Sequence, residues 1–108
     1  MGYASHPRQG VRLFDLGQIV ATPGVLSAFL LQKPHLISCV RRHAAGDWGN
    51  LHTQDKAVND AAVKDGTRIM SAYQIDPKKP SLGYGDNTLW IITEADRSVT
   101  TLLLPDEY

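Results

Sequence analysis

The residues best suited to chemistry in this 108-residue chain stand in the run Thr93-Glu94-Ala95-Asp96-Arg97. Two carboxylates and one arginine fall within four consecutive residues and follow a threonine. Such a set can hold a phosphate or a divalent cation, or supply a catalytic acid. The same residue types also suit a polar hairpin tip closed by a salt bridge. Both interpretations stay open, but two carboxylates alone are too few to predict a metal site, and we expect no cofactor.

A second polar cluster begins with Arg41, Arg42 and His43, just before the middle of the chain. The arginines suit phosphate contacts, and His43 suits acid–base chemistry near neutral pH. The alternative is an ordinary basic last turn of a helix, with His43 as a half-buried, hydrogen-bonded ring. His43 shares a helical face with Leu36 and Val40, which favours this alternative.

A loop, Gly46-Asp47-Trp48-Gly49, follows this cluster and holds a tryptophan between glycines. Trp48 could stack on a base or hold a partner protein. The favoured alternative is that Trp48 tucks back on the core while Asp47 caps a turn.

Two further polar residues have predicted structural partners. Arg68 shares its strand face with the apolar Met70 and Ala72, so it needs an acidic partner. Glu94 or Asp96 can supply that partner. The helical residue Asn59 is predicted to be a buried amide bonded to a neighbouring strand.

Composition limits the classes of protein to which this chain can belong. Eleven basic and eleven acidic residues give zero formal net charge, which disfavours indiscriminate DNA binding. The single cysteine, Cys39, excludes an intrachain disulfide. No apolar run reaches the ~18 residues of a membrane-spanning helix, and MGYASHPRQG is not typical of a signal peptide. We therefore expect a cytoplasmic protein without membrane association, with a flexible tail over residues 1–10.

The elements that position these residues are predicted from apolar runs and turn signals. A strand is expected within 12–21, and a helix begins at Pro23 with Thr22 as its N-cap. The run VLSAFLLQ is apolar on nearly every face, so this first helix is expected to be deeply buried. Further helices are predicted over His35–Ala45 and Thr53–Asp65. The inner face of the last helix is expected to consist of four small residues: Ala57, Val58, Ala61 and Ala62.

Three strands are expected in the C-terminal third, over residues 67–75, 88–94 and 98–104. Residues 76–87 hold prolines and glycines and predict an exposed loop. The fold class is therefore α+β: an N-terminal strand, three helices, then a three-stranded antiparallel meander.

The last two strands are expected to form a hairpin in which Thr93 pairs with Thr100 and Trp90 with Leu103. This register gives the sheet two apolar faces. The helices can cover one face, and a second copy of the chain is an economical cover for the other. We therefore predict a single, dimeric domain over residues 11–108, with the meander or the buried first helix at the interface.

Part of the chain resembles a known family. The resemblance is carried by RHAAGDWG (Arg42–Gly49), GTRIMSAY (Gly66–Tyr73) and LWIITEADRSVTTLLLPDEY (Leu89–Tyr108). These runs are similar to a family of small bacterial proteins borne on plasmids and mobile elements. The resemblance implies a plasmid-linked context and no catalytic assignment. The order of helices before a meander is also similar to that of the RelE/barnase-like ribonuclease toxins, which is an analogy of topology.

These observations predict a non-enzymatic nucleic-acid-binding or regulatory protein of a plasmid, acting as a homodimer. Its partners are then a second copy of itself and DNA or RNA. Arginines would bind phosphate, and aromatic rings would stack on bases. The residues expected in this interface are Arg41, Arg42, Trp48, Arg68, Tyr73 and Arg97.

Two alternatives come from other classes. One is a metal-independent ribonuclease in which His43 and Glu94 are the acid–base pair, while Arg68 and Arg97 stabilise phosphate charge. This alternative requires the four side chains to converge on one cleft. The other alternative is a protein-interaction module that binds no nucleic acid.

Overall fold

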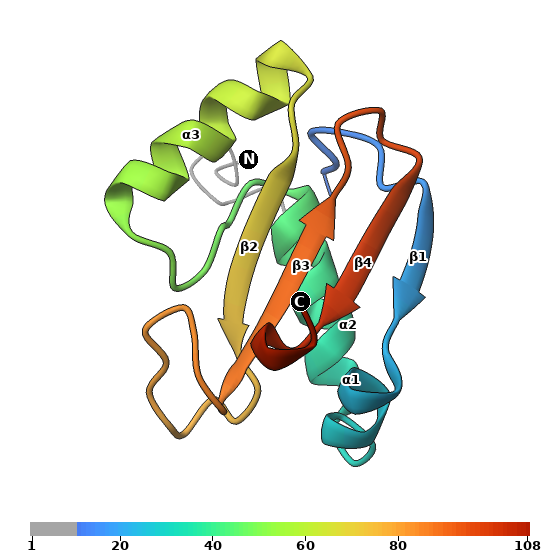
Figure 1. The fold of residues 1–108 in the computed structure, drawn as a ribbon, viewed down its shortest axis with the longest axis vertical. Coiled ribbons are helices and arrows are strands. Elements are labelled where there is room, and N and C mark those ends of the chain that lie inside the picture. Colours follow the sequence, from blue (N-terminus) through green and yellow to red (C-terminus); the bar gives the residue numbers. More distant parts are fainter. Residues whose placement is uncertain (1–10) are drawn as a thin grey trace, which may run out of the picture.

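The computed structural model describes residues 11–108, which form a four-stranded mixed sheet with three α-helices (Figure 1). The strands are β1 (Gln18–Ala21), β2 (Ile69–Gln74), β3 (Thr88–Thr93) and β4 (Val99–Leu103), in the order β1-β4-β3-β2. The helices are α1 (Pro23–Ala28), α2 (Lys33–Ala44) and α3 (Thr53–Asp65), and a short 3₁₀ helix, η2 (Pro105–Glu107), follows β4. The α+β class is confirmed. The predicted tail over residues 1–10 lies outside the described residues.

The expected strand order needs a correction, because β1 joins the sheet and pairs in parallel with β4. The other strands pair antiparallel, with Thr93 opposite Thr100 and Trp90 opposite Leu103 as predicted. Turn signals identify hairpins between neighbours in the sequence, but no local signal marks a pairing between opposite ends of the chain. β1 is also shorter than the expected strand, because the chain before it turns toward α2, where the Leu13 N–H bonds the Ala44 carbonyl.

α3 has the predicted bounds. Gly66 ends it with a φ of +73° and donates its N–H to the Ala62 carbonyl. The predicted inner face is mostly wrong, since the buried residues are Asn59 and Ala62. α3 runs beside β2 rather than across the sheet, so only a narrow stripe of it touches the rest of the protein (Figure 1). Three residues expected inside are exposed: Ala57, Val58 and Ala61.

The expectation of a deeply buried first helix is wrong. Thr22 caps α1 as predicted, accepting the Val25 N–H at 3.2 Å. The helix then ends after six residues, and Val25 is its one buried residue. It lies beyond the end of β1 instead of on the sheet (Figure 1). One side of the predicted run still reaches the core, because Val25 and the C-cap residue Phe29 are buried in an apolar cluster. The exposed residues are Leu26 and, in the turn after α1, Leu30 and Leu31.

α2 crosses one face of the sheet, which we call the back face (Figure 1). Apolar side chains from β3 and β4, including Leu89, Ile91 and Leu102, form a buried cluster there with Cys39 of α2. A second cluster beside it contains Trp48 together with Phe14, Leu16, Ala44, Ala62 and Ile69.

The opposite face, which we call the front face, is covered by the chain itself. Ile92 and Leu103 on this face are buried within one chain. The indole N–H of Trp90 donates to the Gly83 carbonyl at 2.8 Å, and the Tyr108 ring meets Trp90 edge-on. The loop after β2 and the C-terminal segment thus supply the cover that we expected from a second copy.

The two edges of the sheet differ. The segment 48–50 runs along β2, with hydrogen bonds from the Asn50 N–H to the Ala72 carbonyl and from the Ala72 N–H to the Trp48 carbonyl. On β1, Gln18 and Thr22 donate to carbonyls of β4 and its preceding turn. Because alternate N–H groups of a strand point to opposite sides, the N–H of Ile19 points away from β4, to the side of β1 that has no neighbouring strand. No other described element pairs with that side.

Candidate functional site

His43 lies in the interior between α2 and the back face, with 0% of its surface exposed. Its Nδ1 contacts the Ser71 hydroxyl, and its Nε2 lies 2.9 Å from Thr93 Oγ1. The Thr93 and Thr100 hydroxyl oxygens are 2.7 Å apart, and Thr100 donates to the Leu16 carbonyl. Because Thr100 uses its single hydroxyl hydrogen on Leu16, it must accept a hydrogen bond from Thr93. Thr93 then accepts from the Nε2–H of His43, which leaves Nδ1 without a hydrogen, so Nδ1 accepts from Ser71.

Burial keeps His43 neutral. Burial first, and then the charge of Arg97, lowers the pKa of His43 to about 3. The ribonuclease alternative pairs His43 with Glu94, which directly follows the Thr93 that His43 contacts. Successive strand residues point to opposite faces, so Glu94 lies on the front face, where it meets Arg68. The sheet separates the two groups, and they do not converge on one cleft.

The aromatic residues expected to stack on bases are both interior. Trp48 is 3% exposed, packs against Phe14, and donates its indole N–H to the Asp60 carboxylate at 2.8 Å. Tyr73 is fully buried and donates its hydroxyl to the Asp47 carbonyl at 2.6 Å. Burial raises the pKa of the Tyr73 hydroxyl above its ordinary value. The alternative for Trp48, that it tucks back on the core, is confirmed, and neither ring offers a face to a ligand.

Arg42 holds the loop that follows α2. Its Nε donates to the Asp47 carboxylate at 2.8 Å, and its guanidinium lies over the Tyr73 ring at 4.7 Å. Burial raises the pKa of Asp47, but the hydrogen bond and charge of Arg42 outweigh burial and leave it below its ordinary value. The Asp47 carboxylate also accepts the Gly49 N–H. Gly49 has a φ of +74°, and a Cβ there would collide with the Ala72 carbonyl, so only glycine fits.

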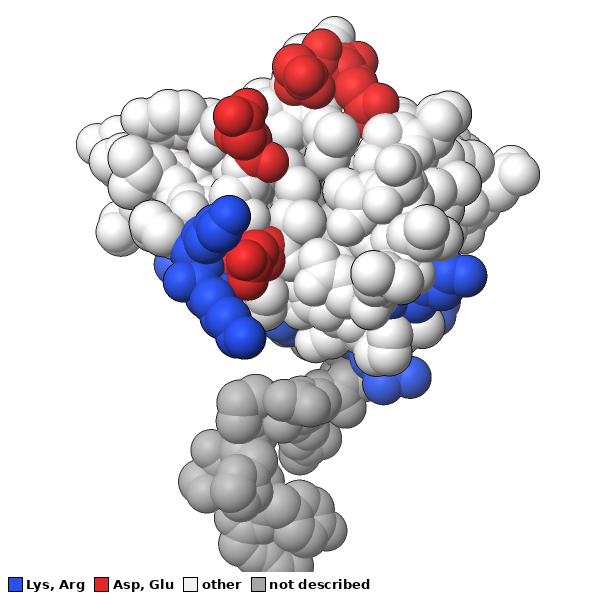
Figure 2. Space-filling view, turned by 90° about the horizontal axis from the view of Figure 1, so that it is seen from below, with Lys and Arg blue, Asp and Glu red and all other residues white. Residues whose placement is uncertain are grey.

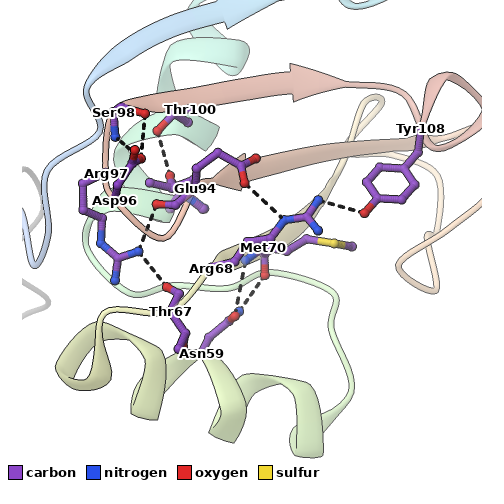
Figure 3. A network of polar contacts seen from close by, with 12 residues as sticks. Asn59, Thr67, Arg68, Met70, Glu94, Asp96, Arg97, Ser98, Thr100 and Tyr108 are labelled. Atoms are coloured by element: carbon purple, nitrogen blue, oxygen red, sulfur yellow. Dashed lines mark hydrogen bonds and ion pairs between the residues drawn. The ribbon is translucent and has the colours of Figure 1, made fainter.

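Arg97 also turns inward. It adopts a left-handed conformation with a φ of +61° at the β3–β4 turn. Its guanidinium donates to the Thr67 carbonyl at 2.6 Å (Figure 3). It also donates to the Ala62 carbonyl at 2.9 Å. Asp96 accepts the hydroxyl and the N–H of Ser98, which lower the pKa of the Asp96 carboxyl. At Asp96 and Arg97 the contacts are those of a polar hairpin tip.

The polar cluster that faces solvent is centred on Arg68, on the front face (Figure 3). Arg68 Nη2 donates to the Tyr108 hydroxyl at 2.9 Å, and the guanidinium carbon lies 5.4 Å from the centre of that ring. Arg68 Nε lies 3.9 Å from a Glu94 carboxylate oxygen. The predicted pairing of Arg68 with Glu94 is confirmed. Because both side chains are nearly half exposed, this ion pair adds little stability.

Arg68 lines a pocket of about 310 Å³ between β2 and α3. Asn59 forms part of its wall and bonds both the carbonyl and the N–H of Met70, as predicted for a buried amide. Asp55 also lines the pocket, so the lining holds both a carboxylate and a guanidinium. The other lining residues are Leu51, Val58, Met70 and Tyr108.

The residues expected to bind phosphate are not gathered into one surface. Arg68 lies on the front face and Arg97 is bonded to backbone carbonyls, while Arg42 holds Asp47. Arg41 is exposed and makes no ion pair with any described residue. Seen from the end that carries α1 and the loop after β2, basic side chains stand in separate groups, and acidic side chains lie both beside one of these groups and along the opposite margin of the same face (Figure 2). This face carries no continuous basic surface.

Two residues in these sites have no signal in the sequence. Tyr108 reaches Arg68 across 40 residues of chain, and only the folded sheet brings them together. Arg12 lines a groove with Arg41, although no spacing rule links a residue before β1 to one in α2. The sequence predicts a hydrogen-bonded His43, but it does not identify the partners. Ser71 and Thr93 reach His43 only because β2 and β3 pair in the sheet.

Comparison with protein-family models, curated proteins and solved structures finds no match to this chain. Among residues 11–108, no group of three or more histidine, cysteine, aspartate or glutamate side chains is arranged to hold a metal ion. Within the same range, none of the helices has the length and apolar character needed to cross a bilayer.

Proposed function

We propose that this chain is a non-enzymatic binding protein that works as a homodimer, joined through an apolar surface on β1 and α1. The observation that carries the proposal is a concentration of exposed apolar side chains in one part of the fold. Leu31 is 97% exposed and Leu30 is 63% exposed. We call the whole set the β1–α1 surface. It consists of Ile19 and Val20, which flank the free edge of β1 on opposite faces, together with Leu26 of α1 and, in the turn after α1, Leu30 and Leu31.

Two physical arguments favour a second copy on this surface. Burying apolar area stabilises an interface by roughly 25 cal/mol for each Å² removed from water, and contiguous apolar patches on soluble proteins commonly mark interaction sites. The free side of β1 also offers backbone donors and acceptors that a second β1 can satisfy by antiparallel pairing. Zero formal net charge adds little repulsion between copies.

The absence of catalysis is supported by the placement of the candidate groups. His43 is buried and neutral, and Glu94 lies on the other face of the sheet. Burial raises the pKa of the Cys39 thiol to about 11, so it is not a thiolate nucleophile at neutral pH. The regulatory role on a plasmid, which the sequence resemblance implies, belongs to this proposal and is compatible with a binding protein.

Light scattering on the full chain tests the homodimer. The protein concentration is roughly tens of micromolar, in the range of the Kd values of such interfaces. We expect the mass of two chains for the wild type and of one chain for the double variant Leu26→Asp, Leu31→Asp. Both leucines are exposed, so the variant retains its circular dichroism spectrum. The control is Val58→Asp, which places the same charge at an exposed apolar position on α3 and leaves the dimer intact. A monomeric wild type contradicts the proposal.

Nucleic-acid binding is the second candidate, and the free guanidinium of Arg41 favours it. A titration of labelled duplex DNA and of labelled single-stranded RNA at several salt concentrations tests this candidate. Phosphate contacts give a steep loss of affinity with salt, and Arg41→Ala then reduces the slope by about 1. No binding at low salt removes this candidate and leaves the homodimer proposal untouched.

A further inference from the structure

A groove of about 510 Å³ lies between β1 and α2 on the back face. α2 crosses behind β3 and β4 rather than behind β1 (Figure 1), and the groove lies beside it, next to β1. Ile19 of β1 and Ile37 of α2 form its two sides and are each about half exposed. Its floor and walls are otherwise apolar, with Leu16, Ala21, Leu36, Val40, Ala44 and Leu102.

Two cations complete this lining. Arg12 and Arg41 both face the groove, and no aspartate or glutamate lines it. Both arginines are exposed, and neither makes an ion pair with a described residue. In this respect they differ from Arg42 and Arg68, whose guanidinium groups have acidic partners. The groove therefore combines an apolar interior with positive charge that has no partner.

We propose that this groove binds a small amphipathic anion, with an apolar body on the floor and a carboxylate or similar anionic head between Arg12 and Arg41. The volume is in the range of ligand pockets, roughly 300–1,000 Å³. Guanidinium groups are suited to carboxylates because they donate two parallel hydrogen bonds to a planar anion. The apolar body supplies the affinity through burial, and the head supplies orientation and charge selectivity.

Charge and polarity favour this occupant over two others. A nucleic-acid backbone is hydrophilic and would leave the apolar floor of the groove without a contact. A second copy of the chain is formally neutral and would have to bring an acidic side chain to both arginines. The proposed β1–α1 surface shares only Ile19 with the groove, so a dimer and a bound ligand are compatible.

Calorimetric titration of the full chain with sodium dodecanoate tests the proposal. We expect saturable binding of one dodecanoate per chain below about 1 mM, with dodecanol and dodecylammonium weaker by about tenfold or more. In a nitrogen–proton correlation spectrum, the amides of Ala21, Val40 and Ala44 shift with dodecanoate, while that of Leu31 does not. No binding below about 1 mM, or equal binding of dodecanol, overturns the proposal.

A charge-reversal pair supplies the sharper test. Arg12→Glu with Arg41→Glu is expected to abolish dodecanoate binding and to make dodecylammonium the preferred ligand. The control, Lys78→Glu with Lys79→Glu, makes the same change in net charge on the exposed loop after β2 and leaves the preference for dodecanoate unchanged. Equal effects of the two pairs overturn the proposal. If binding appears only in the Leu26→Asp, Leu31→Asp variant, a second copy fills the groove, which also overturns it.

Discussion

At the scale of single residues, His43 shows how position rather than residue type determines chemistry. Histidine is the side chain that ordinarily titrates nearest to neutral pH, which makes His43 an acid–base candidate in the sequence. In the structure its two ring nitrogens are satisfied by Ser71 and Thr93, and burial keeps the proton off. A helical pattern can place a histidine on an apolar face, but it cannot show which hydroxyls the strands bring to it.

The depressed pKa of His43 predicts a pH dependence of stability. The folded-state pKa is about 3, whereas an unfolded histidine has a pKa of about 6.5. Between these values the unfolded chain binds a proton that the folded chain does not, so stability is complete above the upper value and is lost as the pH falls. We expect this residue to lower the free energy of unfolding by about 1 kcal/mol for each pH unit between about pH 6 and pH 4.

Urea denaturation at about pH 7, 6 and 5 measures how the free energy of unfolding changes with pH. These conditions span about half of the pH range in which the His43 effect is expected. His43→Gln removes most of it, because the glutamine amide can bond the same hydroxyls without titrating in this range. His52→Gln, at an exposed position, should behave as the wild type does. An unchanged slope in His43→Gln would show that other groups cause the acid sensitivity.

At the scale of elements, Arg97 ties the β3–β4 turn to the end of α3. It combines hydrogen bonds to the carbonyls of Ala62, Thr67 and Glu94 with a backbone conformation that is unfavourable for any residue with a Cβ. Removing the side chain should cost about 2 kcal/mol or more, since hydrogen bonds from charged groups contribute about 1.5–3 kcal/mol each. Arg97→Gly should nevertheless be more stable than Arg97→Ala by about 1 kcal/mol, because glycine accepts the left-handed backbone. Thermal unfolding of the two variants gives the order, and the reverse order refutes this account of the turn.

Asn59 connects α3 to the backbone of β2 at Met70. Asn59→Ala leaves the Met70 N–H and carbonyl without these partners and should cost about 1–3 kcal/mol. The Met70 amide should then exchange its hydrogen faster. Gln54→Ala, at an exposed position on the same helix, is the control and should change stability by less than about 0.5 kcal/mol. Equal costs in the two variants would mean that the amide contacts contribute nothing.

The elements also show where sequence reasoning succeeds. The bounds of α3 and the β3–β4 register follow from local periodicity and turn residues, and both are confirmed. The partner of Arg68 is likewise within reach, because Glu94 was one of two nearby acids. The exposure of α1 and the parallel pairing of β1 depend on contacts between distant segments, which local patterns do not encode.

At the scale of the whole molecule, the proposed dimer predicts that stability depends on concentration. If two chains bury the β1–α1 surface, dimerisation stabilises the folded state by mass action, so the thermal midpoint rises with protein concentration. The Leu26→Asp, Leu31→Asp variant should show no such rise, whereas Val58→Asp should follow the wild type. Differential scanning fluorimetry over a roughly hundredfold range of protein concentration measures this rise, because such a range changes the mass-action free energy by about 2.7 kcal/mol. A midpoint independent of concentration in the wild type would count against the dimer.

The pairing of β1 with β4 has a consequence for the order in which the chain folds. Thr22 donates to the Glu107 carboxylate across 85 residues of chain, so the start of the sheet is held by segments that are made much later in translation. Closing a long loop costs more entropy than closing a hairpin, and distant contacts form slowly. We expect β2, β3 and β4 to assemble first and β1 to dock afterwards. In pulse-labelled hydrogen exchange during refolding, the amide of Ile91 should then gain protection before that of Val20.

Until β1 docks, Ile19 and Val20 belong to a mobile apolar segment. A ribosome-bound chain halted before Val99 should therefore be the form most prone to aggregate.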